Sequence, residues 1–484
     1  MEVEFLSRAL FALTAAFHFL FPPVSIGFAL YIFIVEALWV ARRDEKYLRA
    51  AKFFLRLFGL LFAVGAATGI VMVFQFGTNW PAYSNFVGDV FGSPLAIEAV
   101  AAFFLESTFL AVSLWGWEKV GRKTHLLSTF LVCLGAHLSA VWILAANSFM
   151  QTPSGFRIFK NGEMMPENFA PASEAVAECS AKIQDFWGMV FSPSFFDRFT
   201  HTIAASWAAG GFFAMGVCAY FILRRRDLDV FKAPAKIAAV FAFAACLAVL
   251  QTGHSSAKTV ALTQPEKFAA FEAHYKTQKN APLCVLGWAC GDGCEPRGIM
   301  AKSLLSILAH GSPDAEVKGL EDLPSDEFLL KLHPNATAEE LAQIRPNYWP
   351  PVNPAFQAFH FMSYLGGAML CVSFLSLVLL YRDRFFDVQK FVPRVLQKVL
   401  MWSALLPILA SQLGWATAEI GRQPWIVWHV LKTKDAVTTS ACAGEILFSI
   451  ILFALLFIAI VCVFFFVLAR KMRGGLDGKA SYGN

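Results

Sequence analysis

Nine long apolar segments constrain the fold of this chain more than any other feature of its sequence. They cover roughly residues 10–40, 53–76, 94–117, 125–149, 198–223, 234–251, 356–381, 396–417 and 444–469, and the sixth is the shortest. Crossing the hydrocarbon core of a bilayer takes about 20 apolar residues in a helix, and each segment reaches or approaches that length. Only 15% of the 484 residues are charged, against about 25% in soluble domains. The sequence therefore predicts an all-α polytopic membrane protein with about nine transmembrane helices.

The distribution of basic residues predicts the orientation of these helices. The connectors after spans one, three, five and seven and the tail after span nine are basic, through Arg42, Arg43, Lys46, Arg49, Lys119, Arg122, Lys123, Arg224, Arg225, Arg226, Lys232, Arg382, Arg384, Lys390, Arg394, Arg470, Lys471, Arg473 and Lys479. The connector 77–93 has no Lys or Arg. Because Lys and Arg accumulate in cytoplasmic loops, we expect the N-terminus outside and the C-terminus in the cytoplasm. Arg422, Lys432 and Lys434 in the last outer loop are the exceptions.

Two further conclusions follow from the same pattern. The net charge of +5 is spread over the connectors between spans, so it does not indicate nucleic-acid binding. The first apolar run is too long for a cleavable signal peptide, and no small-residue cleavage site precedes Arg42. We therefore interpret it as a retained first span.

Two outer excursions, 150–197 and 252–355, interrupt the helices. We divide the chain into 1–251 with helices one to six and the outer loop 150–197, the extracytoplasmic loop 252–355, and 356–484 with helices seven to nine and a cytoplasmic tail. The loop 252–355 contains a helix-like run, Gln264–Gln278. A loop this long is usually functional or disordered, and its charged and aromatic content favours function.

The cysteines fall into two groups. Six lie in or beside spans and are interpreted as packing residues, whereas four lie in the outer loops: Cys179, Cys284, Cys290 and Cys294. An oxidising compartment permits one or two disulfides among these four. A metal site is the weaker alternative, because no histidine lies at a zinc-finger spacing.

Several ionisable residues lie inside predicted spans, where they are costly and usually functional. His18 is either a metal ligand or a helix-end histidine that binds a neighbouring carbonyl. Glu98 and Glu106, about 12 Å apart along a helix and about 80° apart around it, suit a proton relay or a haem-side ligand. The alternative is that each is a hydrogen-bonded acid between helices.

His201 and Met362 lie at the outer starts of spans five and seven. A methionine alone is normally a packing residue, but His360 is two residues away and His201 lies at a matching depth. His/Met ligation suits a low-spin, electron-transferring haem.

Glu419 follows the apolar run Val399–Thr417 and shares a helical face with Trp415. A carboxylate ligand leaves a haem high-spin, which suits O₂ chemistry. Arg422, one turn later, can bind a haem propionate through two hydrogen bonds. The alternative is a Glu–Arg ion pair at a helix end.

The remaining histidines give weaker signals. His125, His310, His333 and His429 are interpreted as ordinary polar residues of loops or span edges. His137 and Asn147 suit either a proton path or structural hydrogen bonds.

Four stretches occur together, in order and at matching depths. They are His18; Ile97–Ala99 with Phe104–Thr108; Gln264–Ala273; and Trp415 with Glu419–Trp425. In this combination the chain resembles subunit I of the cytochrome bd-type quinol oxidases over almost its whole length. The loop 252–355 is then expected to bind quinol.

The resemblance implies three haems. His201 and Met362 would hold a low-spin haem b. His18 and Glu419 would serve two high-spin haems, one a haem b and the other a haem d or a third haem b. Trp415 and Arg422 belong to the motif around Glu419 and are expected in the catalytic site.

Further residues match the family's functional positions. Lys267 and Glu272 match residues implicated in quinol oxidation, and they are about 140° apart around a helix. Glu98 and Glu106 match acids linked to proton delivery and to the high-spin site.

The implied activity is that of an electrogenic quinol:O₂ oxidoreductase of the respiratory chain, in the bacterial cytoplasmic (inner) membrane. Quinol would be oxidised at the outer face and its protons released there. Electrons would pass inward, and O₂ would be reduced to water with cytoplasmic protons. Charge is then separated without a pump, which contributes to the proton-motive force.

The expected partners are quinol, O₂, the lipid bilayer and a second membrane subunit, with no nucleic acid. The second subunit is either the usual subunit II or a paralogue of this chain, and small single-span subunits are optional additions.

Two features depart from the family pattern. His360 occupies a position that is often arginine, so a fixed cation beside the low-spin haem is in doubt. The run Cys284, Cys290, Cys294 is not a family feature.

Two other classes of membrane protein are weighed against this interpretation. A b-type cytochrome with two low-spin haems usually carries paired histidines on the same helices, and no span here has two histidines separated by a full haem-binding repeat. A secondary transporter often has repeated halves, and no repeat is visible.

Overall fold

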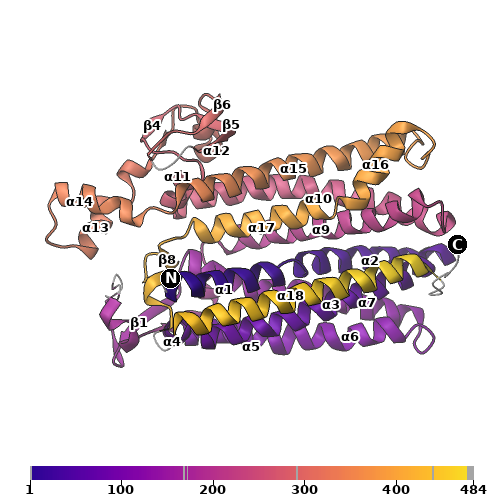
Figure 1. Ribbon diagram of the computed structural model, residues 1–484, viewed down its shortest axis with the longest axis horizontal. Helices are drawn as coiled ribbons and strands as arrows, with labels where there is room; N and C mark the ends of the chain where they lie inside the picture. The colour runs from indigo at the N-terminus through magenta and orange to yellow at the C-terminus, as the bar shows by residue number, and fades with distance from the viewer. Residues whose placement is uncertain are drawn as a thin grey trace.

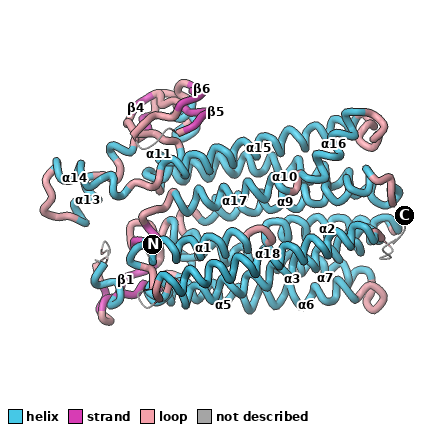
Figure 2. Tube along the Cα trace, viewed as in Figure 1, coloured by secondary structure: helices cyan, strands magenta, loops and turns pink. Residues whose placement is uncertain are grey.

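The computed structural model describes residues 3–166, 169, 171, 173–289, 293–438 and 441–476. The molecule is an elongated bundle of long helices, and its strands gather at one end (Figures 1 and 2). The helices that form the bundle are α1 (Val3–His18), α2 (Pro22–Arg42), α3 (Glu45–Thr78), α5 (Gly88–Ile97), α6 (Phe104–Trp115), α7 (Arg122–Gln151), α9 (Phe195–Leu223), α10 (Leu228–Thr263), α15 (Val352–Tyr381), α16 (Phe391–Trp402), α17 (Leu405–Ile420) and α18 (Ala443–Gly474).

The predicted number of spans is confirmed within these residues. Eight helical segments are long and apolar enough to cross a bilayer, and the bent pair α16–α17 makes the ninth. The prediction that the sixth span is the shortest is wrong, because α10 has 36 residues and runs to Thr263. The division of the chain at residues 251 and 355 stays a prediction, although this helix continues past its first boundary.

Three spans that were predicted as continuous helices are interrupted. The first span consists of two helices, α1 and α2. Pro22 and Pro23 lie in the first turn of α2, a position that suits proline. The eighth bends by 44° between α16 and α17. Pro407 has no N–H for the carbonyl of Ser403, so the helix cannot continue through the bend.

The third interrupted span contains a π-helix. Residues Glu98–Phe103 have this conformation, between α5 and α6. A π-helix winds the chain differently from an α-helix, so the predicted separation of Glu98 and Glu106 around a regular helix is wrong. Such π-turns inside α-helices are frequent at functional sites.

The two excursions, 150–197 and 252–355, lie at the same end of the bundle, together with the start of α1, whereas α18 ends at the opposite end (Figure 1). With an odd number of spans, the start of α1 and the end of α18 must lie at opposite ends of the bundle. The first excursion holds the antiparallel sheet β2-β1-β3, built from β1 (Phe156–Lys160), β2 (Glu163–Met164) and β3 (Cys179–Ile183).

The second excursion combines short strands with short helices. β4 (Gln278–Lys279) pairs with β7 (Glu316–Val317), and β5 (Leu283–Trp288) pairs with β6 (Arg297–Ala301). The loop between α17 and α18 contributes the hairpin of β8 (Trp425–Val427) and β9 (Leu431–Lys432). The short helices of this end of the bundle are α4 (Pro81–Phe86), α8 (Phe186–Val190), α11 (Pro265–Phe271), α12 (Leu304–His310), α13 (Asp326–Leu332) and α14 (Ala338–Ile344).

The helix that was predicted over Gln264–Gln278 is shorter in the structure. It is α11, and it ends at Phe271. Ala273 has a φ of 49°, and the N–H of His274 binds the carbonyl of Ala269. A left-handed residue with such a backward bond is a common way for a helix to end. Glu272 therefore lies at the C-cap, outside the helix.

The disulfides expected in the outer loops are not formed between the described cysteines. Cys179, Cys284 and Cys294 are free thiols, and Cys290 lies outside the described residues.

Close packing of α2 against α9 fixes the centre of the bundle. A methyl group on Gly27 would lie 1.9 Å from the carbonyl oxygen of Ser206, and one on Gly210 would meet the backbone of Gly27. Small residues allow such close approach of membrane helices. This contact sets the position of α9, which carries His201.

Candidate functional site

α17 brings the candidate ligands on several helices together. Near its middle, the Gln412 amide donates to the carbonyl of Ala16, two residues from His18. Gly414 contacts the side chain of Met362 on α15. Glu419 lies in its last turn. The half-buried Trp415 lies between Gly414 and Glu419 along the helix.

His18 ends α1, and its ring contacts both a threonine side chain and the backbone of Gly65 on α3. Its Nδ1 lies 3.0 Å from Oγ1 of Thr68 on α3. Thr68 uses its own proton in a 2.9 Å bond to the carbonyl of Val64, so its oxygen accepts the proton on Nδ1. This fixes the tautomer and leaves the lone pair of Nε2 for a metal. A methyl group on Gly69 would lie only 3.2 Å from the ring.

His201 has the same arrangement on α9. Its Nδ1 lies 3.2 Å from Oγ1 of Thr252 on α10, and Thr252 donates at 2.7 Å to the carbonyl of Ala248. Nε2 is again left as the lone-pair nitrogen. A methyl group on Gly253 would lie 3.1 Å from the ring. Each of the two histidines predicted as haem ligands thus has its own threonine partner and its own adjacent glycine.

Met362 is the third candidate ligand that lies against a glycine. A methyl group on Gly414 would lie 2.9 Å from its sulfur atom. His201 and Met362 belong to helices of one bundle, since α9 packs on α10, α10 on α15 and α15 on α17.

His360, two residues before Met362, is buried between two carbonyl groups. Its Nδ1 lies 3.0 Å from the oxygen of Phe356, and its Nε2 lies 2.9 Å from that of Cys284. A neutral imidazole can donate to only one of them. Both ring nitrogens of His360 therefore lie against carbonyl oxygens of the protein.

Glu419 is part of a buried polar cluster. Arg422 donates to its Oε2, and Asn147 Nδ2 donates to its Oε1 at 3.1 Å. Arg198, on α9, donates to the side-chain oxygen of Asn147. The Glu–Arg contact that was the alternative to haem ligation is thus present, although a second and a third helix also contact this carboxylate network.

Lys267 points into the same region from α11. Its Nζ donates to Gln151 Oε1 at 2.7 Å and to Gln264 Oε1 at 3.4 Å. The Gln151 amide in turn donates to the carbonyl of Ala418, at 3.3 Å. Burial lowers the pKa of Lys267 well below its usual value, and the charge of Arg198 lowers it further.

Positive charge is in excess in this cluster. Arg198, Arg422 and Lys267 face one carboxylate, Glu419, within the described residues. The Nε atoms of Arg198 and Arg422 and the Nη1 of Arg422 are buried without a described hydrogen-bond partner. Buried cations are normally paired, so this cluster can bind the carboxylate groups of a ligand.

Sequence reasoning missed Arg198 and Gln151. For Arg198 the available signal was its position, one turn before His201 at the edge of an apolar span.

The two acids of the third span lie beside α7. Ser139 donates to Glu98 Oε1 at 2.7 Å, and Glu98 is half-buried. Glu106 is 8% exposed and lies against Gly135, where a methyl group would come within 3.0 Å of its Cβ. The structure places both on one wall of the bundle.

Glu272 is separated from Lys267 by the end of α11. Its side chain is buried, and its Oε2 has no partner among the described residues. Burial raises the pKa of Glu272 to about 8. This carboxyl group is therefore mostly protonated at neutral pH.

His125, which was expected to be an ordinary polar residue, is buried. Its Nδ1 lies 2.6 Å from Glu36 Oε1, and its Nε2 lies 3.1 Å from the carbonyl of Ser113. His137 accepts from the Trp207 indole at 3.0 Å, and its Nδ1 binds the carbonyl of Cys133 at 2.7 Å. Both rings are satisfied by protein atoms, which favours structural roles.

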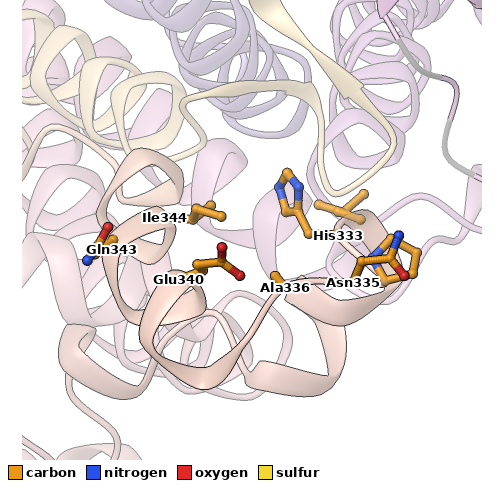
Figure 3. A pocket seen from close by; sticks show the side chains of 8 residues that line it. His333, Asn335, Ala336, Glu340, Gln343 and Ile344 are labelled. Carbon is orange, nitrogen blue, oxygen red and sulfur yellow. The ribbon is translucent and has the colours of Figure 1, made fainter.

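A cavity of about 560 Å³ lies outside this cluster (Figure 3). It is formed between α13 and α14 in the second excursion, and its lining includes His333, Asn335, Glu340 and Ile344. His333 also binds the hydroxyl of Tyr348, at 3.0 Å. None of the predicted ligands lines this cavity.

Comparisons with known proteins agree with one another. A family model described as cytochrome bd terminal oxidase subunit I matches residues 6–476. The chain is 35% identical to cytochrome bd ubiquinol oxidase subunit 1 of Bacillus subtilis (strain 168), over 98% of this chain and 94% of the relative. It is 34% identical to cytochrome bd-II ubiquinol oxidase subunit 1 of Escherichia coli (strain K12), over 93% and 92%. The solved structure of bd oxidase from Geobacillus thermodenitrificans matches with a TM-score of 0.83 and 29% identity, over 98% of each chain.

Proposed function

The chain belongs to the cytochrome bd terminal oxidase subunit I family, and on this premise we propose how its residues hold the haems and the quinol. As a member of that family it is a multi-span bacterial membrane protein with quinol oxidase activity. Haem cofactors and a second subunit are implied by the family.

The observation that carries the assignment is the shared environment of the candidate ligands. His18 and His201 each present a lone-pair Nε2 fixed by a threonine, and both lie against glycines. His201 and Met362 would hold a low-spin haem b. His18 and Glu419 would serve the two high-spin haems, a haem b and either a haem d or a third haem b. When bound, these haems would carry single electrons, and a high-spin haem would bind O₂.

The buried cations supply the second part of the proposal. Among the described residues, Arg422 and Arg198 have donors without a hydrogen-bond partner, and the propionates of the haems are carboxylates that suit guanidinium groups. Lys267 lies in the same cluster. The residues present therefore fit haem groups, in charge and in hydrogen-bonding capacity.

Quinol is proposed to react at the end of the bundle that carries the long loops, which we assign to the outer face. Lys267 and Glu272 belong to this end, and quinol protons would be released there. Protons for water would come from the cytoplasm, with Glu98 and Glu106 on the path. This separation of charge would generate proton-motive force without pumping. The partner is proposed to be subunit II or a paralogue of this chain.

Replacing Met362 by leucine tests the low-spin site. The change keeps size and apolarity but removes the sulfur ligand. We expect the low-spin haem signal to be lost or converted in the reduced-minus-oxidised spectrum, while the high-spin signals persist. Met369→Leu, a buried methionine of the same helix, is the matched control. An unchanged low-spin spectrum in Met362→Leu would remove this residue from the ligand set.

Replacing Glu272 by glutamine tests the quinol site. A protonated carboxyl can donate a hydrogen bond and later release its proton, whereas an amide cannot release one. We expect quinol oxidation to fall about tenfold or more, with oxygen consumption from an artificial electron donor largely intact. Because the pKa of Glu272 is raised to about 8, the wild-type quinol rate should titrate near pH 8 and the variant should not. Equal losses with both donors would mean that this loop is structural.

A further inference from the structure

Glu266 and His429 form a contact that the proposed function leaves without a role. His429 Nε2 lies 3.4 Å from Glu266 Oε1. Glu266 belongs to the first turn of α11, and His429 lies in the turn between β8 and β9. The contact therefore joins the second excursion to the last outer loop.

Glu266 is buried, and only one of its two carboxylate oxygens has a partner among the described residues. Its side chain is 5% exposed, and its Oε2 has no hydrogen-bond partner among the described residues. A buried carboxylate oxygen without a partner is costly. This oxygen can accept a proton or a hydrogen bond from a ligand beside α11. Lys267 follows directly in the chain, yet its ammonium group points to Gln151 instead.

His429 connects this buried acid to solvent. Its ring stacks between Phe328, at 4.0 Å, and Trp428, at 4.7 Å. The stacking fixes the ring, and Nε2 faces Glu266. The side chain is nevertheless 29% exposed. An imidazole held between a buried acid and water is suited to passing a proton.

The other charged groups around this contact have partners of their own. The Lys432 ammonium lies over the rings of Tyr348 and Trp425, at 4.6 and 5.7 Å from their centroids. On α13, Asp326 pairs with Arg345, and the exposed Glu327 pairs with Lys331. Within the described residues, His429 is the ion-pair partner of Glu266.

Quinol oxidation needs such a route. Each quinol that is oxidised to quinone gives up two electrons and two protons, and the protons must leave a buried site. Burial raises the pKa of Glu272 to about 8, so this carboxyl group is mostly protonated at neutral pH and is a poor acceptor for either proton. Glu266 is the acid of α11 that has both a free oxygen and a neighbour in contact with solvent.

We propose that Glu266 and His429 form the proton exit for quinol oxidation. The inference rests on the proposed function. In each of two steps a quinol O–H bond would break, one electron would leave for the haem that His201 and Met362 would hold, and the proton would pass to Glu266 Oε2. The proton then transfers from the carboxyl group to His429 Nε2, and the imidazole releases a proton to the water at the outer end of the bundle. After two such steps the quinol has become quinone, and it has given up two electrons and two protons.

Glu266→Gln tests the acceptor. It keeps the shape of the side chain and abolishes its basicity. We expect the kcat for quinol-driven oxygen consumption to fall by about 100-fold, the usual size of a general-base effect. The haem spectrum and the rate with a one-electron artificial donor should stay at wild-type values, because neither depends on proton release from quinol. The solvent deuterium isotope effect on kcat should rise.

His429→Phe tests the exit with the aromatic stack preserved. We expect a loss of kcat in the same direction, with little change in KM. The double variant Glu266→Gln/His429→Phe should be no slower than Glu266→Gln alone, since both residues serve one path. Glu327→Gln removes an exposed acid from the same loop and is the matched control, with a wild-type rate expected.

The outcomes separate this inference from the proposed function. Wild-type quinol turnover in Glu266→Gln would overturn the proton exit, as would equal losses with both donors or additive losses in the double variant. If the wild-type protein oxidises no quinol while reducing O₂ with the artificial donor, the quinol site itself is wrong.

Discussion

Replacing Glu419 by glutamine is expected to remove or perturb a high-spin haem and its CO binding, while the low-spin haem remains. The carboxylate is the one acid that faces Arg198, Arg422 and Lys267 among the described residues. Glutamine cannot ligate iron as an anion, and it leaves the buried guanidinium groups of Arg198 and Arg422 without an acid. Breaking a buried ion pair costs about 3–5 kcal/mol, so we also expect a lower melting temperature.

The spectra distinguish a ligand from a helix-end ion pair. If Glu419 only pairs with Arg422, then Glu419→Gln and Arg422→Gln should both lose stability and keep every haem spectrum. As a ligand, Glu419 should produce the spectral change, whereas Arg422→Gln should alter stability and the local electrostatics of the haem. A Glu419→Gln protein with normal haem content and CO binding would defeat the assignment.

Replacing His201 by alanine should eliminate the low-spin haem completely. This change is harsher than Met362→Leu, because it removes the nitrogen ligand that Thr252 orients. Quinol-driven oxygen consumption should fall to the background rate, since electrons from quinol would have no acceptor at the outer end. The CO-binding high-spin signals should persist, because His18 and Glu419 are unchanged.

Two controls make this result specific. His310→Ala removes an exposed histidine at the end of α12, and it should leave the haem content at the wild-type value. Thr252→Val keeps His201 but removes the hydroxyl that fixes its tautomer, so it should lower low-spin haem content only in part. A full low-spin signal in His201→Ala would exclude this histidine as a ligand.

The spans were predictable from the sequence because hydropathy alone decides which segments can cross a bilayer. The candidate ligands with ionisable side chains could be proposed from the sequence because such residues are rare and costly inside spans. His18, Glu106 and Glu419 all stood out in this way. The functional pattern came from the resemblance of four separate stretches, which periodicity alone would not have supplied.

The remainder depends on contacts between distant segments. Thr68 and Thr252 are unremarkable in the sequence, and their role is visible only where α3 meets α1 and α10 meets α9. Arg198 was overlooked because its partner Asn147 lies 51 residues away.

Backbone geometry was the other limit on prediction. The π-helix at Glu98–Phe103 and the 44° bend before α17 have no hydropathy signal. The early end of α11 at Phe271 left Glu272 outside the helix. In the outer loops, the compartment favoured disulfides, but Cys179 and Cys284 lie in strands of separate sheets and are free thiols.

The reduced-minus-oxidised spectrum of the purified membrane protein, recorded with and without CO, tests the central claim most directly. The account predicts one low-spin haem component that ignores CO and high-spin components that bind it. A spectrum without haem would indicate a transporter-like protein, and a spectrum with low-spin haems and no CO-binding component would indicate a b-type cytochrome of another class. Either result would contradict the assignment of His18, His201, Met362 and Glu419 as haem ligands.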